Sequence, residues 1–108
     1  MTTYLMNSAV MPAGNFGVYR YTPATLADLA EVMSGPHTSC LGYPQNADLV
    51  QAWTGVRPEV NRVETRFSPG DRALVMRLTR RVSNPAAKGA LVSEDPADWE
   101  FAWVHFEG

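Results

Sequence analysis

The chain has 108 residues, of which 45% are hydrophobic and 19% charged, and its formal net charge is −2. This length is enough for one domain with one modest core, and the composition is that of a globular chain, not a disordered one. The small acidic excess argues against a general DNA- or RNA-binding protein, because such proteins carry a basic excess. We therefore expect a single domain over residues 1–108 and no long nucleic acid as its partner.

The scarcity of cysteine and histidine limits the chemistry further. Cys40 is the single cysteine, so no disulfide can form within the chain, and a free thiol suits a reducing cytoplasm. Because His37 and His105 are far apart in the sequence, a zinc site lacks its usual set of ligands. No apolar run is long enough to span a membrane, and no signal-peptide pattern is present. We expect a cytoplasmic protein, in the host cytoplasm if it is viral, with no metal, no cofactor and no membrane association.

Five segments have the composition or the alternation of β-strands. They are residues 2–6, 16–21, 61–67, 72–78 and 100–106. The turn-forming residues 68–71 lie between two of them, so we predict that residues 61–67 and 72–78 form a hairpin. Residues 100–106 are apolar on both faces, which places them inside a sheet or at a subunit interface.

Two segments have the signals of helices. The first begins at residues 22–23, where Thr and Pro favour a helix start, and ends at residues 34–36. The second covers residues 46–53. Each carries an apolar stripe, formed by Leu26, Leu29 and Met33 in the first and by Leu49, Val50 and Trp53 in the second. Together with the five strands, these helices predict an α/β fold, a mixed five-stranded sheet flanked by helices.

The joint between the apolar run 38–42 and the second helix has the properties of a ligand site. Asn46 and Asp48 suit a helix start, whose backbone N–H groups and dipole attract anions. Gly42 permits a tight turn and a close approach of the backbone to a ligand. Asn7 and Ser8 follow the first strand at its carboxyl end, where ligands commonly sit in α/β folds. The alternative is an ordinary strand–turn–helix joint, in which these side chains complete local turns.

A succession of short motifs carries a resemblance to a known family. Leu5-Met6-Asn7-Ser8-Ala9-Val10-Met11-Pro12 stands near the start, followed by Thr38-Ser39-Cys40-Leu41-Gly42, Asn61-Arg62-Val63, Gly70-Asp71-Arg72, and Arg81 after an apolar strand. Each motif is weak alone, but their order and spacing from Tyr4 to Phe106 resemble the viral ring-nuclease (anti-CRISPR) family. The resemblance implies a homodimer with a pocket across its axis for cyclic tetra-adenylate, the second messenger of type III CRISPR immunity.

The resemblance also implies a metal-independent reaction, in which a ribose 2′-hydroxyl attacks the neighbouring phosphorus and a histidine protonates the leaving oxygen. Carried over to this chain, Arg81 would contact phosphate, and Asn7 and Ser8 would hydrogen-bond adenine or ribose. Arg81 belongs to a basic cluster with Arg77, Arg80 and Lys88. The candidate ligand-binding residues are Asn7, Ser8, Ser39, Gly42, Tyr43, Gln45, Arg81 and Asn84, and the catalytic candidates are Tyr43 and Arg81.

Two positions depart from the family pattern. Tyr43 stands where the family has its histidine, and Asn84 stands near the place of an acidic residue. A general acid contributes about 10²- to 10⁴-fold and works best with a pKa near the operating pH, whereas the ordinary pKa of tyrosine is about 10. Stacking on an adenine, worth ~1–3 kcal/mol per base, suits Tyr43 better. His37, six residues earlier, is an alternative proton donor, and His105 fits a sheet face or an interface.

Three functions are therefore open. The first is sequestration of a cyclic nucleotide messenger by a dimer that retains the pocket but lacks the proton donor. The second is a working ring nuclease that uses Tyr43, His37 or orientation of the 2′-hydroxyl alone. The third is a protein-binding dimer without a nucleotide, contacting its partner through Trp99, Phe101 and Trp103. Such aromatic residues are more often part of a core.

Overall fold

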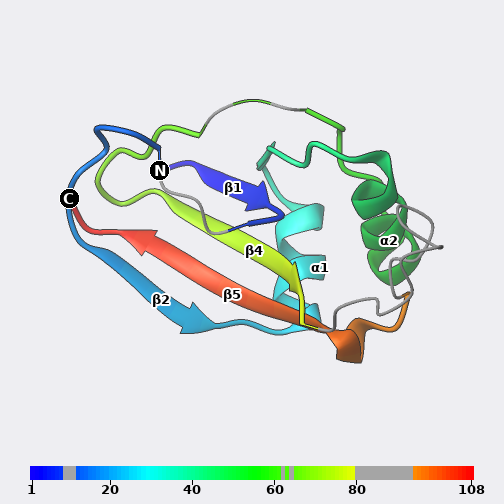
Figure 1. The fold of residues 1–108 in the computed structure, drawn as a ribbon. Helices are drawn as coiled ribbons and strands as arrows, with labels where there is room; N and C mark the ends of the chain where they lie inside the picture. The colour runs from blue at the N-terminus through cyan, green and yellow to red at the C-terminus, as the bar shows by residue number, and fades with distance from the viewer. Residues whose placement is uncertain (9–11, 62, 64, 80–93) are drawn as a thin grey trace, which may run out of the picture.

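One mixed β-sheet organises the chain (Figure 1). The structure is a computed structural model, and it describes residues 1–8, 12–61, 63, 65–79 and 94–108. The elements in chain order are β1 (Thr3–Met6), β2 (Tyr19–Pro23), α1 (Leu26–Ser34), β3 (Thr38–Ser39), α2 (Pro44–Thr54), β4 (Arg72–Leu78), the short 3₁₀-helix η2 (Pro96–Asp98) and β5 (Trp99–Phe106). The five strands lie in the order β2-β5-β4-β1-β3.

The strand directions give the sheet two different ends. β1 runs parallel to both β3 and β4, and β5 runs antiparallel to β4 and β2. The carboxyl ends of β1, β3 and β4 therefore meet at one end of the sheet, which we call the carboxyl end, and their first residues meet at the amino end. β5 lies inside the sheet, between β2 and β4, as its two apolar faces predict, whereas β2 is an outer strand that ends at Pro23.

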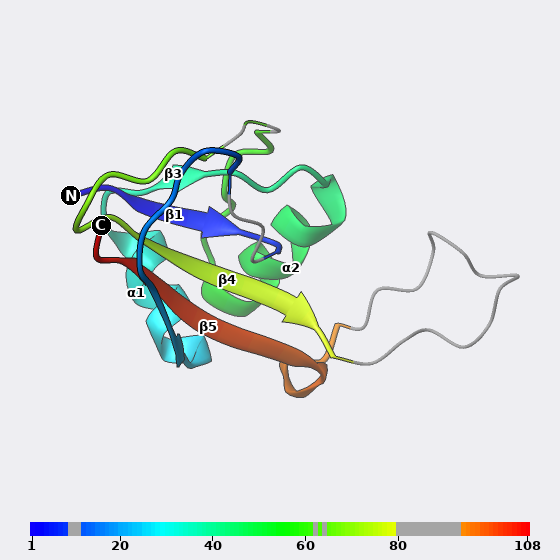
Figure 2. The same ribbon diagram turned by 60° about the vertical axis from the view of Figure 1, so that its left-hand side comes forward.

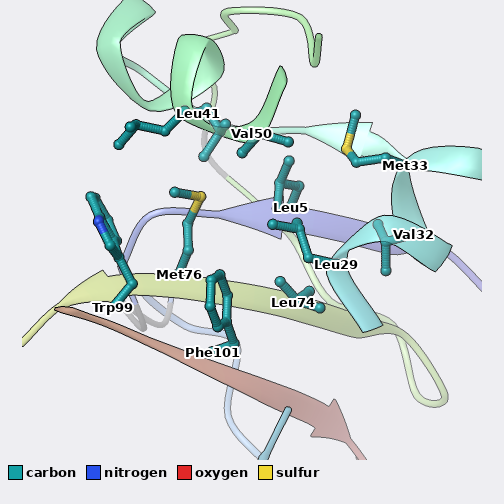
Figure 3. Packing of buried hydrophobic residues seen from close by; sticks show 11 residues of the cluster. Leu5, Leu29, Val32, Met33, Leu41, Val50, Leu74, Met76, Trp99 and Phe101 are labelled. Atoms are coloured by element: carbon teal, nitrogen blue, oxygen red, sulfur yellow. The ribbon is translucent and has the colours of Figure 1, made fainter. Parts of the chain in front are cut away.

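Both helices pack on one face of the sheet over the larger part of the core (Figure 3). Leu5, Leu74 and Met76 point from the strands toward Leu29 of α1 and Val50 of α2. The predicted stripes of both helices are confirmed, because Leu29, Val32, Met33, Leu49 and Val50 are buried and Leu26 and Trp53 pack against the same cluster. Trp99 and Phe101 are buried as well, and Trp103 packs against them. These aromatic residues belong to the core.

The opposite face of the sheet is covered by irregular chain. Residues 12–18, which lead into β2, pass over this face (Figure 2). Phe67 packs here with Val75, Val104 and Phe106. The side chain of Asn15 holds Phe67 in place, because its Oδ1 accepts from Phe67 N at 2.6 Å and its Nδ2 donates to Phe67 O at 3.0 Å. One amide side chain thus satisfies both backbone groups of Phe67, as a neighbouring strand would.

The predicted hairpin of residues 61–67 and 72–78 is wrong. β4 already has β1 on one side and β5 on the other, so no third strand can join it. In the part of this segment that the structure describes, Thr65 and Phe67 are buried as the alternation indicates, but Val63 is 50% exposed. The described residues of this segment form no strand, Phe67 packs on the sheet face, and β3, a two-residue strand parallel to β1, takes its place in the count of five.

Both helices begin elsewhere than predicted. Thr22 and Pro23 end β2, and α1 starts after Thr25, whose side chain forms a capping box with Asp28. α2 starts at Pro44, with Tyr43 in the N-cap position, so Asp48 lies beyond the first turn. The predicted end of α1 is confirmed at Ser34. α2 ends at Thr54, one residue beyond its predicted end, before Gly55, which takes the left-handed conformation that glycine favours.

Candidate functional site

The carboxyl end of the sheet brings together most of the predicted ligand-binding residues that the structure describes. Asn7 and Ser8 directly follow β1, and Gly42 to Gln45 connect β3 to α2. Cys40 N donates to Leu5 O at 2.8 Å, so the end of β3 stays beside the end of β1. Side chains that are far apart in the sequence thereby share one end of the sheet, which is where open α/β sheets bind ligands.

Tyr43 occupies the start of α2. Its side chain makes no capping hydrogen bond to the helix, and the residue is 49% exposed. Pro44, the first helical residue, has no N–H group, so this helix start has one unpaired donor fewer than usual. Asn46, which we predicted at the helix start, is buried inside the first turn. The aromatic ring of Tyr43, beside the exposed Gln45, is therefore the accessible group at this helix end.

Ser39 differs from the other predicted residues because it acts inside the fold. It is 5% exposed, and its Oγ donates to Glu59 O at 2.5 Å and accepts from Leu41 N at 3.4 Å. Asn61 completes the connection, with its Nδ2 donating to Ser39 O at 3.1 Å and its N donating to Leu41 O at 2.8 Å. Through these hydrogen bonds, Ser39 and Asn61 hold the segment after α2 against the end of β3 and so stabilise the backbone that leads to Gly42 and Tyr43. The sequence motif around Asn61 did not predict its hydrogen bonds to Ser39 and Leu41.

Replacing Ser39 with alanine is expected to lower the free energy of unfolding by roughly 1–3 kcal/mol, because the carbonyl of Glu59 loses its buried donor. Urea denaturation of the native protein and S39A measures the difference. The exposed Ser34→Ala variant is the control, since its hydroxyl lies at the surface. Equal stability of S39A and the native protein would contradict the role assigned to Ser39.

A polar cluster that the sequence did not predict lies on the sheet face opposite the helices. Glu100 accepts from the hydroxyl of Tyr21 through Oε1 and from Arg77 Nη2 through Oε2, the latter at 3.4 Å. The hydrogen bond from Tyr21 is the main reason why the pKa of Glu100 is lowered, and the same bond raises the pKa of Tyr21. The cluster fixes Arg77 near the end of β4. Arg77 and Glu100 are paired across β4 and β5, and the side chain of Tyr21 reaches Glu100 from β2.

Of the basic cluster, the structure describes only Arg77. Arg81 and Asn84, together with Arg80 and Lys88, lie outside the described residues.

Cys40, close to the predicted site, is partly buried, and this burial raises the pKa of its thiol. A raised thiol pKa is the opposite of what an activated nucleophile needs. Cys40 is therefore a packing residue and not a catalytic candidate.

Both histidines lie at the amino end of the sheet, away from Tyr43. His37 precedes β3, its Nδ1 lies 2.9 Å from Gly35 O, and it lines a surface cavity of about 220 Å³ with Thr2 and Thr3. His105 is near the end of β5 and lines another cavity, of about 500 Å³. His37 is thus on the opposite end of β3 from Tyr43, which argues against its use as a replacement proton donor.

The described part of the chain contains neither a metal-binding cluster nor a membrane-spanning helix. Over these ranges, no three His, Cys, Asp or Glu side chains lie close enough together to hold a metal ion. In the same part of the chain, neither helix has the length and the apolar character that crossing a membrane requires.

Comparisons with known proteins identify relatives of this fold. The family model described as STIV B116-like matches residues 3–98. Protein ORF117 of the Acidianus two-tailed virus is 26% identical over 84 residues, which are 74% of this chain and 72% of ORF117. The structure of B116 of Sulfolobus turreted icosahedral virus (STIV) matches with a TM-score of 0.72 at 17% identity, over 97% of this chain and 99% of B116. The last likeness shows that the mixed five-stranded sheet with its two helices is a shared fold. Because the family model covers most of the sequence, the chain belongs to the STIV B116-like family of archaeal virus proteins.

Proposed function

We propose that this protein binds a cyclic oligonucleotide second messenger, cyclic tetra-adenylate or a related ring, and removes it from antiviral signalling by sequestration. The observation that carries the proposal is the position of Tyr43. An accessible aromatic ring stands at the start of α2, beside the carboxyl ends of β1 and β3, where the ring-nuclease pattern has a histidine. The site keeps polar groups for nucleotides, but tyrosine takes the place of the proton donor.

The chemistry of the described residues fits a nucleotide. The ring of Tyr43 can stack on an adenine, since every base has a π face, and this is worth ~1–3 kcal/mol per base. Asn7, Ser8 and Gln45 offer side-chain donors and acceptors for the edges of a base or for ribose. A guanidinium such as that of Arg81 forms two hydrogen bonds to a phosphate. A ring of four nucleotides has a symmetry that a homodimer can match, so two copies of each group would contact it.

Calorimetry with a panel of cyclic oligonucleotides of different ring size and base tests the proposal. We expect saturable binding of at least one ring, and we expect Arg81→Ala to abolish it because the phosphates lose their cation. Arg66→Ala, which removes an exposed arginine that is not among the predicted ligand-binding residues, is the matched control and should bind normally. Absence of binding to every ring by the native protein would refute the proposal.

Incubation with excess protein separates sequestration from slow cleavage. The ligand is mixed with a molar excess of protein, and chromatography follows its products over many hours. An intact ligand supports sequestration. Linear products would mean that orientation of the 2′-hydroxyl is enough for catalysis here, because holding it in line with phosphorus accelerates the reaction by itself.

A further inference from the structure

A row of three side chains crosses the sheet at its amino end. In the strand register, Arg20 of β2 lies opposite His105 of β5, and Arg72 of β4 lies opposite His105 on its other side. Directly paired residues of neighbouring strands point to the same face of a sheet, so the three side chains stand side by side. We call them the cationic row. It lies on the same face as Leu74 and Trp103, which are paired two residues further along.

The helices leave the β2 and β5 part of this row open. Figure 1 shows the end of β5 and the start of β2 far from both α1 and α2. A cavity of about 500 Å³ opens there, lined by Arg20, Thr22, Gly70, His105, Phe106 and Glu107. Arg20 and His105 thus line a cavity, and Arg72 is the cross-strand neighbour of His105. The place is at the opposite end of the sheet from Tyr43.

The charges around the cationic row favour an anion. The guanidinium of Arg72 lies 4.4 Å from the centre of the Trp103 ring, and its Nε donates to Thr3 Oγ1 at 3.2 Å, so it is held without a carboxylate among the contacts described. Arg20 has Glu107 as its partner, at 2.5 Å, and both side chains are largely exposed. An exposed ion pair of this kind is weak and easily exchanged. The carboxylate of Asp71, beside Arg72 in the sequence, accepts from Thr2 N and Ser68 N instead.

We propose that the cationic row and its cavity form a second binding site, which takes a phosphomonoester group. Neighbouring strands lie about 4.8 Å apart, so the Cα atoms of the two arginines are separated by roughly 10 Å, with His105 between them. Arginine side chains bridge that distance and present paired donors that match the oxygens of a phosphate. The imidazole adds a third donor, and the three terminal oxygens of a phosphomonoester can accept from all three groups. The double negative charge lets the phosphate compete with Glu107 for Arg20.

The test is a titration of ¹⁵N-labelled protein followed by NMR. Sodium phosphate, adenosine 5′-monophosphate and adenosine are added separately, with the ionic strength held constant by chloride. We expect saturable shifts at the amides of the cationic row and at the Trp103 indole with both phosphates and none with adenosine. If sodium phosphate and adenosine 5′-monophosphate bind with equal affinity, the phosphate group is the whole ligand. If the nucleotide binds more tightly, the site takes the phosphate ester of a larger molecule.

Two variants should change the phosphate affinity in opposite directions, which tests the proposal directly. Arg20→Gln should weaken phosphate binding about tenfold or more, because a charged hydrogen-bond donor is lost. Glu107→Gln should strengthen binding severalfold, because it frees Arg20 from its competitor. Arg66→Gln, with the same change of charge elsewhere on the surface, should leave the affinity unchanged. Shifts that do not saturate, or an Arg66→Gln variant that weakens binding as much as Arg20→Gln, would overturn the proposal.

Discussion

A Tyr43→His variant is expected to cleave cyclic tetra-adenylate at least about 10²-fold faster than the native protein, within the 10²- to 10⁴-fold that a general acid contributes. The reason lies in the position of residue 43 at the exposed start of α2, where an imidazole would titrate near neutral pH and could protonate the leaving oxygen. Incubation of the ring with excess variant, followed by chromatography of the linear products, measures the rate.

Tyr43→Phe is the matched control for this gain. It keeps an aromatic ring for stacking and removes only the hydroxyl, so it should bind the ring about as tightly as the native protein and cleave it no faster. If Tyr43→His binds the ring and still leaves it intact, then residue 43 does not face the leaving oxygen. Position 43 would then not correspond to the histidine position of the ring-nuclease pattern.

Truncation of Leu74 to alanine is expected to lower the free energy of unfolding by about 2–5 kcal/mol. Leu74 is completely buried in β4, between β1 and β5, and its side chain points into the main core opposite α1 (Figure 3). The deletion removes apolar contacts and leaves a cavity that strands held on both sides cannot close. Urea denaturation followed by far-UV circular dichroism measures the change.

Val63→Ala is the control for this loss of stability. Val63 is 50% exposed, so its truncation should change the free energy of unfolding by no more than ~0.5 kcal/mol. Similar losses for the two variants would mean that the residues around 63 are packed in solution and that the position of Leu74 does not dominate the core.

The elements of this fold could be predicted where the apolar period is unambiguous. The stripe of α1, with Leu29 and Met33, and the double-sided burial of β5 both follow from spacing alone. Residues 61–67 misled the same reasoning, because an extended segment that packs on a sheet face buries alternate residues just as a strand does. Its backbone partner is the side chain of Asn15, fifty-two residues away. β3 is too short for any period to be visible.

The candidate site was predictable in part for a similar reason. Polar residues after a strand carry a local signal, which singled out Asn7 and Ser8 as candidates, and the family pattern singled out Tyr43. Their gathering at one end of the sheet depends on the parallel pairing of β1 and β3. Ser39 has the same local signal, yet its hydroxyl is used by Glu59, a contact that only the fold creates. The cluster of Tyr21, Arg77 and Glu100 and the cationic row come from cross-strand register, which the sequence does not encode locally.

The outer strand β2 restricts how this protein can assemble. Val18 N donates to Gly108 O and Val18 O accepts from Glu107 N, and Ala24 N donates to Phe101 O. In this antiparallel register the main-chain groups of Tyr19, Tyr21 and Pro23 therefore point outward. Proline has no N–H to give, so a chain that tried to lengthen the sheet here would run out of donors after two residues. Pro23 thereby disfavours fibril growth by strand addition on this side, and we expect a twofold partner to dock here through side chains.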